Sequence, residues 1–597
     1  MDSLLWCFRP RKRRDLHDWK QIEAKANNVE SQPSWHDPSD NTLLFEGFEW
    51  HIPNDNRHWR RLKRALPALH AIGVDSVWLP PGCKAMNPSG NGYDIYDLYD
   101  LGEFDQKGCT ATKWGSFADL EALMEDAHAL GVGVYWDAVL NHKAGADFPE
   151  RFEAVKVDSQ RRDVEIATPQ EISGWTGFSF SGRGPVHSAQ EYHWYHFSGV
   201  DWDDAAQENA IFRICGAGKP GWAEDVGREL GNYDYLMFAD LDYSHPEVRA
   251  DVLRWGTWIG QRLGLKGMRL DAAKHFSMRF QKAFAAHMRA TTDPEFVVIG
   301  EYWTGDVQEL VRYVQTEMEG TVVAVDAPLV HNFSRVSLEK GRGDLRRVLR
   351  GTLVERCGGN ALTFVENHDT QPGQMMENTI TPEFKLLAYA LILLRQEGRP
   401  CLFYGDLYGI WDAQRQQAHR DAVYAYQLPI LTRTRKLFAY GEQQDYFDQA
   451  HCIAIPQIAQ IAHIAQSGDD FMTFGHKLPS RGGVSYLTPT PCATAGFVRY
   501  GNARHPAGLA CVLSNAPGRA TKRMYVGQRH AHATWTEVLE GDSSKLGAVV
   551  IDARGYGEFP VEGGGVSVWV DAAAPDRGRL MDPLYVFDPA WCGMRRR

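Results

Sequence analysis

The chain has 597 residues, of which 44% are hydrophobic, 23% charged and 12% aromatic, as expected for a globular protein of two or three domains. Its formal net charge of −12 and pI near 6.0 argue against a nucleic-acid partner, because binding a polyanion requires clustered positive charge. The sequence contains no run of 18 apolar residues, so we expect no membrane span.

The ten cysteines are scattered, without a CxxC pair or a spacing typical of metal sites. This distribution favours reduced thiols over a disulfide framework. The first residues, MDSLLWCFRPRKRRD, carry a short apolar run followed by a basic cluster, the reverse of the order in a secretory signal. We therefore expect a cytoplasmic protein whose residues 1–40 form a flexible tail.

Strand-like and helical segments alternate from residue 41 onward. The segment 58–73, for example, carries Trp59, Leu62, Leu66 and Leu69 at helical spacing. Eight segments are strand-like: 41–50, 75–81, 131–142, 266–272, 296–303, 321–329, 361–370 and 398–406. Alternation of this kind predicts an α/β fold, a closed (β/α)8 barrel built from residues 41–142 and 266–435.

Two further domains are predicted outside the barrel repeat. Residues 143–265 separate the third strand from the fourth, and a loop of that length predicts a small inserted domain rich in β-strands. Residues 436–597 lose the helical period and predict a C-terminal antiparallel β-sandwich domain. Within it, residues 456–495 show no steady period. We interpret them as an inserted loop that is disordered or is intronic sequence translated in error.

Polar residues gather where the predicted barrel strands end. The third strand ends with Asp137, Asn141 and His142. The later strand ends supply Arg269, Asp271, Lys274, His275, Glu301, His368 and Asp369. Taken alone, the alternating Arg269 and Asp271 would be a surface ion pair. Three acids at the ends of three barrel strands predict instead one shared site at the barrel mouth.

These strand ends resemble a known family. DAVLNH, GMRLDAAKH, the Glu301 of VIGEYW and FVENHD resemble the four diagnostic regions of the α-amylase family, glycoside hydrolase family thirteen, and LMFADLD resembles its fifth region. The similarity runs over about residues 41–570, interrupted at 456–495. It is nearest to liquefying bacterial α-amylases and their intracellular fungal relatives.

The resemblance implies retaining hydrolysis by three carboxylates. Asp271 resembles the nucleophile, and Arg269 next to it favours the ionised carboxylate. Glu301 resembles the general acid/base, which needs a raised pKa to donate a proton near neutral pH. Asp369 resembles the third acid, which stabilises the positive charge of an oxocarbenium-like transition state.

The resemblance also implies substrate contacts. His142 and His368 resemble the two histidines that bind the sugar on the non-reducing side of the cleaved bond, and Tyr93 resembles the aromatic platform under that ring. Lys274 and His275 resemble contacts on the leaving-group side. The implied substrate is an α-glucan.

A calcium site is implied too. Asn141, Asp234 and Asp240 resemble calcium ligands, with the backbone carbonyl of His275 as a further one, and Ca²⁺ prefers such oxygen donors. Two acids that extend this site in the liquefying enzymes fall on Ser198 and Ala223. Because each departure removes a negative charge, we expect a single Ca²⁺.

The sequence thus predicts a monomeric α-amylase that cleaves internal α-1,4-glucosidic bonds of starch, glycogen or maltodextrins. Two alternatives remain open. One is a transglycosylase or maltooligosaccharide-forming enzyme of the same family, and the other is a catalytically silent carbohydrate-binding relative.

Overall fold

The structure is a computed structural model, and it describes residues 41–216, 218–412, 417–418, 426–448, 452–453, 493–539, 547–580, 585–588 and 593–596. The expected tail, residues 1–40, lies outside the described residues. So does almost all of the irregular segment, because only residues 493–495 of it are described, at the start of a strand.

Eight parallel strands form a closed barrel, which confirms the predicted fold. Their order around the barrel is β1-β16-β15-β14-β13-β12-β5-β2. Each of the eight strand-like segments contributes one strand: β1 (Leu44–Glu46), β2 (Ser76–Leu79), β5 (Gly133–Ala138), β12 (Gly267–Leu270), β13 (Val297–Gly300), β14 (Val323–Val325), β15 (Ala361–Thr363) and β16 (Arg399–Phe403). Nearly all their residues are buried, as expected for strands covered by helices.

Helices connect the strands and cover the barrel. They are α2 (His58–Ala71), α3 (Phe117–Leu130), α4 (Pro246–Leu263), α5 (Met278–Thr291), α6 (Val307–Val311), α7 (Ala327–Leu338), α8 (Leu353–Arg356), α9 (Pro382–Leu394), α10 (Tyr404–Tyr408) and α11 (Gln427–Phe438). Local chemistry sets the bounds of α3: Ser116 accepts a hydrogen bond from the Asp119 amide, and Gly131 ends the helix with a φ of +72°.

The segment between β5 and β12 folds into a six-stranded sheet of its own. The order is β6-β11-β9-β10-β7-β8, from β6 (His142–Lys143), β7 (Phe148–Lys156), β8 (Gln170–Gly177), β9 (Phe197–Asp203), β10 (Glu208–Ile214) and β11 (Ala239–Leu241). Because β6 follows β5 directly and β11 precedes α4, this sheet is attached beside the mouth of the barrel.

The C-terminal part is antiparallel. One sheet has the order β19-β21-β22-β27-β24-β25, from β19 (Gln443–Tyr446), β21 (Thr494–Arg499), β22 (Leu509–Ser514), β24 (Thr534–Glu537), β25 (Ala548–Val550) and β27 (Val566–Asp571). A second has the order β20-β23-β26, from β20 (Cys452–Ile453), β23 (Ala520–Tyr525) and β26 (Tyr556–Val561). Buried side chains such as Met524, Phe559 and Trp569 form a core here.

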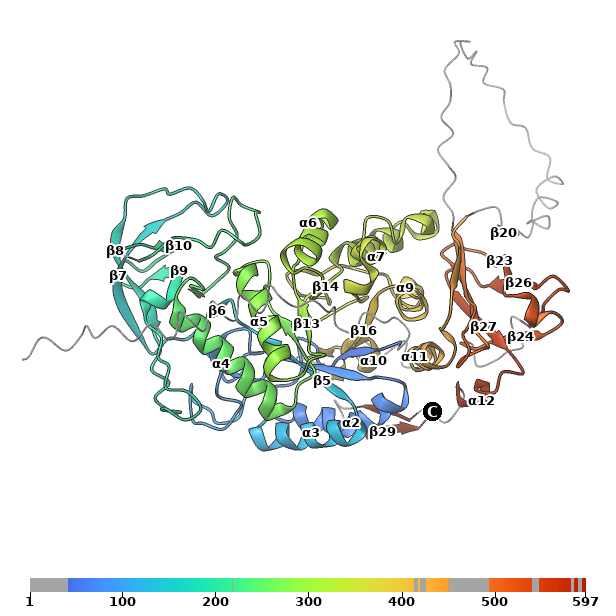
Figure 1. Ribbon diagram of the computed structural model, residues 1–597, viewed down its shortest axis with the longest axis horizontal. Coiled ribbons are helices and arrows are strands. Elements are labelled where there is room, and N and C mark those ends of the chain that lie inside the picture. Colours follow the sequence, from blue (N-terminus) through green and yellow to red (C-terminus); the bar gives the residue numbers. More distant parts are fainter. Residues whose placement is uncertain are drawn as a thin grey trace, which may run out of the picture.

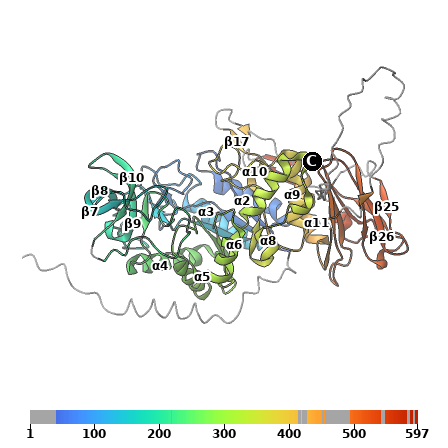
Figure 2. The same cartoon turned by 90° about the horizontal axis from the view of Figure 1, so that it is seen from above.

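The three parts lie in a row. In Figure 1 the inserted sheet lies at one end, the barrel in the middle and the C-terminal sheets at the other end, and Figure 2 shows the same order from above. Helix α9 contacts both β22 and β27, which joins the barrel to the C-terminal part. The residue limits given above for the domains stay predictions. Among the described residues, no helix is long and apolar enough to cross a membrane.

Candidate active site

The acids singled out in the sequence lie at the carboxyl ends of the barrel strands. Asp271 directly follows β12, Glu301 directly follows β13, and Asp369 lies in the loop after β15. Because the strands are parallel, these ends open on one face of the barrel. The structure therefore brings the three residues to one mouth.

The guanidinium group of Arg269, in β12, lies within 3.8 Å of all three carboxylates. Its Nη1 lies 2.8 Å from Oδ1 of Asp271, and its Nη2 lies 2.7 Å from Oε1 of Glu301 and 3.8 Å from Oδ2 of Asp369. Nη1 also lies 2.7 Å from Asp137 Oδ1. Arg269 is only 1% exposed. Arg269 and Asp271 are therefore a buried pair and not a surface one.

Burial divides the three carboxylates into two kinds. Burial raises the pKa of Asp271 and of Glu301, because neither carboxylate is surrounded by water, and Arg269 opposes that rise. Burial would also raise the pKa of Asp369, but His368 and Arg269 together hold it below its usual value. Asp369 is thus held as an anion, whereas burial favours the protonated forms of Asp271 and Glu301.

His368 lies between two carboxylates. Its Nδ1 is 2.6 Å from Oε1 of Glu46, and its Nε2 is 3.1 Å from Oδ2 of Asp369. Burial alone would lower the pKa of His368, but the two carboxylates outweigh it and raise the pKa to about 10. The ring is therefore an imidazolium at neutral pH.

Tyr93 forms an aromatic wall beside these acids. Its hydroxyl donates to Asp137 over 2.9 Å, and its ring stacks on that of His368 with centroids 5.3 Å apart. Trp50 lies parallel to Tyr93, 5.8 Å away between centroids. His142 Nε2 lies 2.8 Å from the Tyr93 carbonyl, and burial lowers the pKa of His142 to about 4. A neutral His142 therefore donates to the backbone of Tyr93.

Lys274 and His275 do not contact the guanidinium cluster; they contact the inserted segment. Lys274 Nζ lies 3.0 Å from Glu229 and donates to the Trp303 carbonyl over 2.8 Å. His275 Nδ1 lies 2.8 Å from the Tyr233 carbonyl, and burial lowers the pKa of His275 to about 3. Both residues thus join β12 to the loop of residues 223–235.

A second group of buried oxygen atoms lies beside this loop. Asn141 donates through Nδ2 to Asp240 over 3.2 Å, and its Oδ1 has no hydrogen-bond partner among the described residues. Asp240 accepts from the hydroxyl of Ser198, and Asp234 accepts from the amide of Ala223 over 2.9 Å. Burial raises the pKa of Asp234 to about 7 and raises that of Asp240. An unsatisfied amide oxygen beside two buried carboxylates fits a hard cation such as Ca²⁺.

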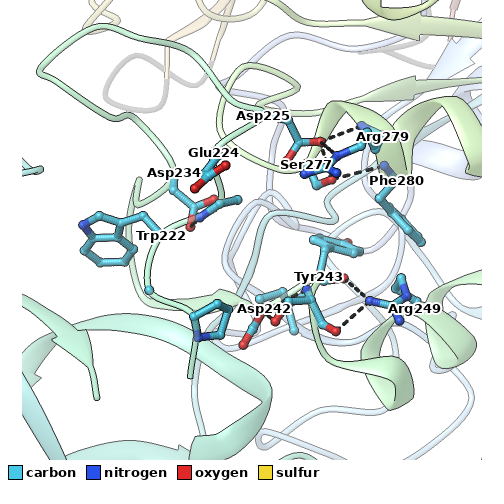
Figure 3. Close-up of a pocket in the computed structure, with 15 residues that line it drawn as sticks. Trp222, Glu224, Asp225, Asp234, Asp242, Tyr243, Arg249, Ser277, Arg279 and Phe280 are labelled. Carbon is cyan, nitrogen blue, oxygen red and sulfur yellow. Dashed lines mark hydrogen bonds and ion pairs between the residues drawn. The ribbon is translucent and has the colours of Figure 1, made fainter. Parts of the chain in front are cut away.

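A cavity of about 360 Å³ adjoins these residues. Figure 3 shows its acidic lining, in which Asp234 lies beside Glu224 while Asp242 lies across the cavity. Asp225 is already engaged, because it accepts hydrogen bonds from Ser277 over 2.7 Å and from the Arg279 amide over 2.8 Å.

The family model described as "Alpha amylase, catalytic domain" matches residues 58–445, which is more than half of the chain. The chain belongs to the α-amylase family. This confirms the resemblance seen in the strand-end motifs. The matched residues include Arg269 and the four carboxylates near it, those of Asp137, Asp271, Glu301 and Asp369.

Two relatives match almost the whole chain. One is an "Alpha-amylase" from Bacillus licheniformis, 39% identical over 89% of this chain and 93% of its own length. The other is a "Cytoplasmic alpha-amylase" from Escherichia coli (strain K12), 34% identical over 89% of this chain and 99% of its own length. Among solved structures, an α-amylase from Geobacillus thermoleovorans complexed with acarbose has a TM-score of 0.55 at 17% identity, covering 91% and 99% of the two chains. That likeness supports the fold alone.

Some residues of this α-amylase site were not singled out in the sequence. Trp50 stacks on Tyr93, and Glu46 contacts His368. Glu46 is the last residue of β1, and an acid within a strand-like segment was the available signal. Trp50 offered no such signal, because nothing local separates it from a core tryptophan.

Proposed function

We propose that this chain is a retaining α-amylase that cleaves internal α-1,4-glucosidic bonds of starch, glycogen or maltodextrins. The observation that carries the proposal is the set of three carboxylates from three strand ends within 3.8 Å of the Arg269 guanidinium. A retaining glycosidase needs two carboxyl groups beside the scissile bond, one as nucleophile and one as general acid/base. The relatives named above support the substrate class.

In the first half-reaction, the protonated Glu301 donates its proton to the glycosidic oxygen as the bond breaks. The carboxylate of Asp271 attacks the anomeric carbon and forms a covalent glycosyl-enzyme, and the leaving chain departs with the proton. Arg269 pairs with both carboxylates, so it keeps their oxygens in fixed positions while the charge moves from one to the other.

In the second half-reaction, the ionised Glu301 removes a proton from water, and the water oxygen attacks the anomeric carbon. Asp271 leaves as a carboxylate, and two inversions give net retention. Asp369 stays anionic throughout, because His368 and Arg269 hold its pKa low. Its negative charge favours the oxocarbenium-like transition state more than the neutral ground state.

We assign substrate contacts on the same basis. Tyr93 and His368 present stacked rings next to Asp369 and are assigned to the sugar on the non-reducing side. His142, which donates to the Tyr93 carbonyl, supports that platform. Lys274 and His275 join β12 to the inserted segment and are assigned to the leaving-group side.

We further propose one Ca²⁺ beside the site. Asn141, Asp234 and Asp240 would hold it, together with the carbonyl of His275, and the bound ion would neutralise the two buried carboxylates. Ser198 and Ala223 offer no carboxylate for a second ion, although both lie against the acids. Such an ion would join β5, β11 and the loop of residues 223–235.

We propose a monomer of the cytoplasm. Free thiols support a reducing compartment, since Cys83, Cys215 and Cys511 are among six free cysteines in the part of the chain that the structure describes. The cytoplasmic relative from Escherichia coli supports the same compartment. Fractionation of the native cells tests this placement, and recovery from the medium would contradict it.

A time course with maltoheptaose and soluble starch, with products separated by chromatography, tests the function. We expect shorter maltooligosaccharides and a rapid fall in starch chain length from internal cleavage. Products longer than maltoheptaose would favour the transglycosylase instead. Equal rates for the wild type and Glu301→Gln would favour the silent carbohydrate-binding relative.

A further inference from the structure

Glu46, the last residue of β1, contacts the buried His368 from inside the barrel. Its Oε1 lies 2.6 Å from His368 Nδ1 and accepts a hydrogen bond from the His368 amide over 3.3 Å. Glu46 is 1% exposed and the side chain of His368 is fully buried. No role has been given to this acid in the reaction described above.

The opposite edge of the His368 ring also faces acceptors. Nε2 lies 3.1 Å from Asp369 Oδ2 and 2.7 Å from the hydroxyl oxygen of Tyr93. The hydroxyl hydrogen of Tyr93 is directed to Asp137, so its oxygen accepts from His368. With acceptors at both edges, both ring nitrogens donate, and His368 is a cation held between two carboxylates.

Three acids and one cation lie near the ring, and the cation, Arg269 of β12, is 3.8 Å from Asp369. Glu46 comes from β1, Asp369 from the loop after β15, and Glu301 from the end of β13, and all three are acids. The aromatic rings of Phe48, Trp50 and Trp78 pack on the remaining sides, with centroids between 4.8 and 6.2 Å from that of His368. Water is thereby excluded, and an ion pair in such surroundings is stronger than one at the surface.

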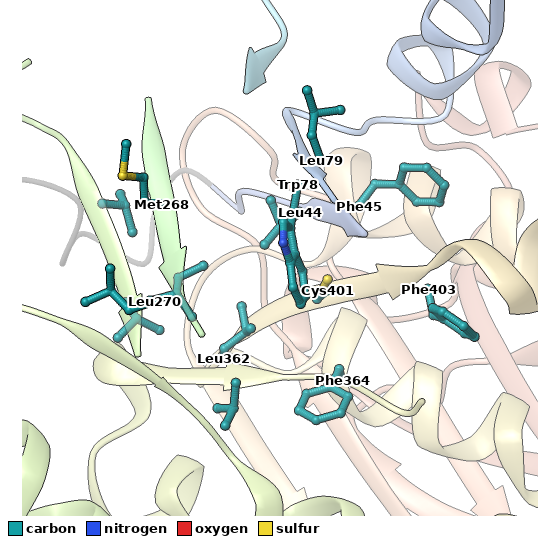
Figure 4. Packing of buried hydrophobic residues seen from close by; sticks show 14 of the residues in the cluster. Leu44, Phe45, Trp78, Leu79, Met268, Leu270, Leu362, Phe364, Cys401 and Phe403 are labelled. Carbon is teal, nitrogen blue, oxygen red and sulfur yellow. The ribbon is translucent and has the colours of Figure 1, made fainter. Parts of the chain in front are cut away.

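Glu46 also lines a small cavity directly beneath the acids. The cavity has a volume of about 10 Å³, enough for about one water molecule, and Arg269 and Glu301 share its wall. Nε of Arg269 has no hydrogen-bond partner among the described residues. Figure 4 shows Trp78 and Cys401, two of the residues that line this cavity. Glu46 therefore contacts His368 directly and shares the wall of this cavity with Arg269 and Glu301.

We propose that Glu46 is a positioning residue for hydrolysis: by accepting the Nδ1 hydrogen of His368, it keeps His368 doubly protonated and its Nε2 directed at Asp369. This inference rests on the proposed function of the site. A neutral His368 with a lone pair at Nε2 would repel the carboxylate of Asp369, which would then turn away or take up a proton. Asp369 would lose the negative charge assigned to it in the transition state.

Glu46→Gln tests the charge, because glutamine keeps the acceptor oxygen and nearly the same volume. Removal of an opposite charge at hydrogen-bond distance shifts a pKa by about 1–3 units. We therefore expect kcat/KM to fall and the pKa of the His368 ring, followed by NMR of its ring nitrogens, to fall by at least about one unit. The matched control is Glu366→Gln, which removes a buried carboxylate that pairs with Lys385 over 2.8 Å. The control should leave the pKa of His368 at its wild-type value.

The same substitution in a His368→Asn background separates positioning from a general effect of charge. Asparagine cannot titrate, so adding Glu46→Gln to His368→Asn should cause little further loss of kcat/KM. An equal loss of kcat/KM in both backgrounds, or a wild-type pKa of His368 in Glu46→Gln, would overturn the proposal.

A stability measurement tests the pair without relying on activity. The pKa of His368 is raised in the folded chain, so its contribution to stability is complete below the unfolded pKa of about 6.5 and is lost as pH rises through about 10. The difference in melting temperature between the wild type and Glu46→Gln should therefore shrink from pH 7 to pH 10. A constant difference would overturn the role of Glu46, whereas an inactive wild type with a shrinking difference would overturn only the proposed function.

Discussion

Arg269 gives the active site its charge balance. One buried guanidinium faces four carboxylates, those of Asp137, Asp271, Glu301 and Asp369. A single positive charge cannot neutralise four negative ones, and burial raises the pKa of Asp271 and of Glu301. The cation at His368, together with Arg269, holds the pKa of Asp369 below its usual value. The site thus combines one carboxyl group held as an anion with two whose protonated forms are favoured by burial.

Replacement of Glu301 by glutamine removes the only group assigned to donate the proton. We expect kcat to fall by at least about 10²-fold, with a much smaller change in KM, because the amide keeps the shape of the side chain. Initial rates on maltoheptaose measure both constants. A loss confined to KM would show that Glu301 binds substrate and does not transfer the proton.

Replacement of Arg269 should damage both stability and catalysis. Arg269→Gln leaves buried carboxylates without their counter-ion, which costs about 3–5 kcal/mol of the free energy of unfolding. Arg269→Lys restores the charge but not the two-pronged guanidinium, so it should recover stability more than kcat. Urea unfolding and initial rates measure the two effects. Equal recovery of stability and rate by lysine would contradict the positioning role of the guanidinium.

At the scale of elements, local chemistry sets where helices begin and end. Ser116 caps α3 by accepting from the Asp119 amide. Ser116→Ala should lower the free energy of unfolding by about 1 kcal/mol, and Ser116→Asn should restore most of it. Activity should not change, because α3 lies outside the barrel and away from the carboxylates. Equal stability losses for alanine and asparagine, measured by thermal unfolding, would contradict the capping account.

The barrel could be predicted because each strand carries its own signal. A short apolar run, such as the one at Leu43–Phe45, followed by polar residues indicates a strand whose end faces the active site, and eight such runs indicate closure. The order of the inserted sheet could not be predicted in the same way. Strand β11 pairs with both β6 and β9, and nothing in local periodicity encodes pairing between segments so far apart in the sequence.

The residues of the site likewise divide into those that the local sequence predicts and those that it does not. The motif residues could be assigned from their strand ends, and the structure gathers Asp271, Glu301 and Asp369 around Arg269 as expected. The contact between Glu46 and His368 could not be assigned, because 322 residues separate the two. Its existence depends on closure of the barrel between β1 and β16, which brings the first strand beside the last.

At the scale of the whole molecule, the barrel connects two β-rich parts, and the inserted part is fixed to the barrel beside the active site. The proposed Ca²⁺ lies at that junction. Chelation should therefore lower both the melting temperature and kcat, and added Ca²⁺ should restore both. We expect one ion per chain in elemental analysis of the purified protein. Two ions per chain would contradict the inference that the site holds a single ion because Ser198 and Ala223 carry no carboxylate.

The central claim is that Asp271 forms a covalent glycosyl-enzyme in a barrel that uses Glu301 as its acid/base. The most direct measurement is mass spectrometry of peptides after the wild type reacts with a fluorinated α-glucosyl fluoride, which slows release of the sugar. The account predicts one added sugar per chain, attached to the peptide that contains Asp271. An active enzyme that carries no adduct, or carries it on another carboxylate, would contradict it.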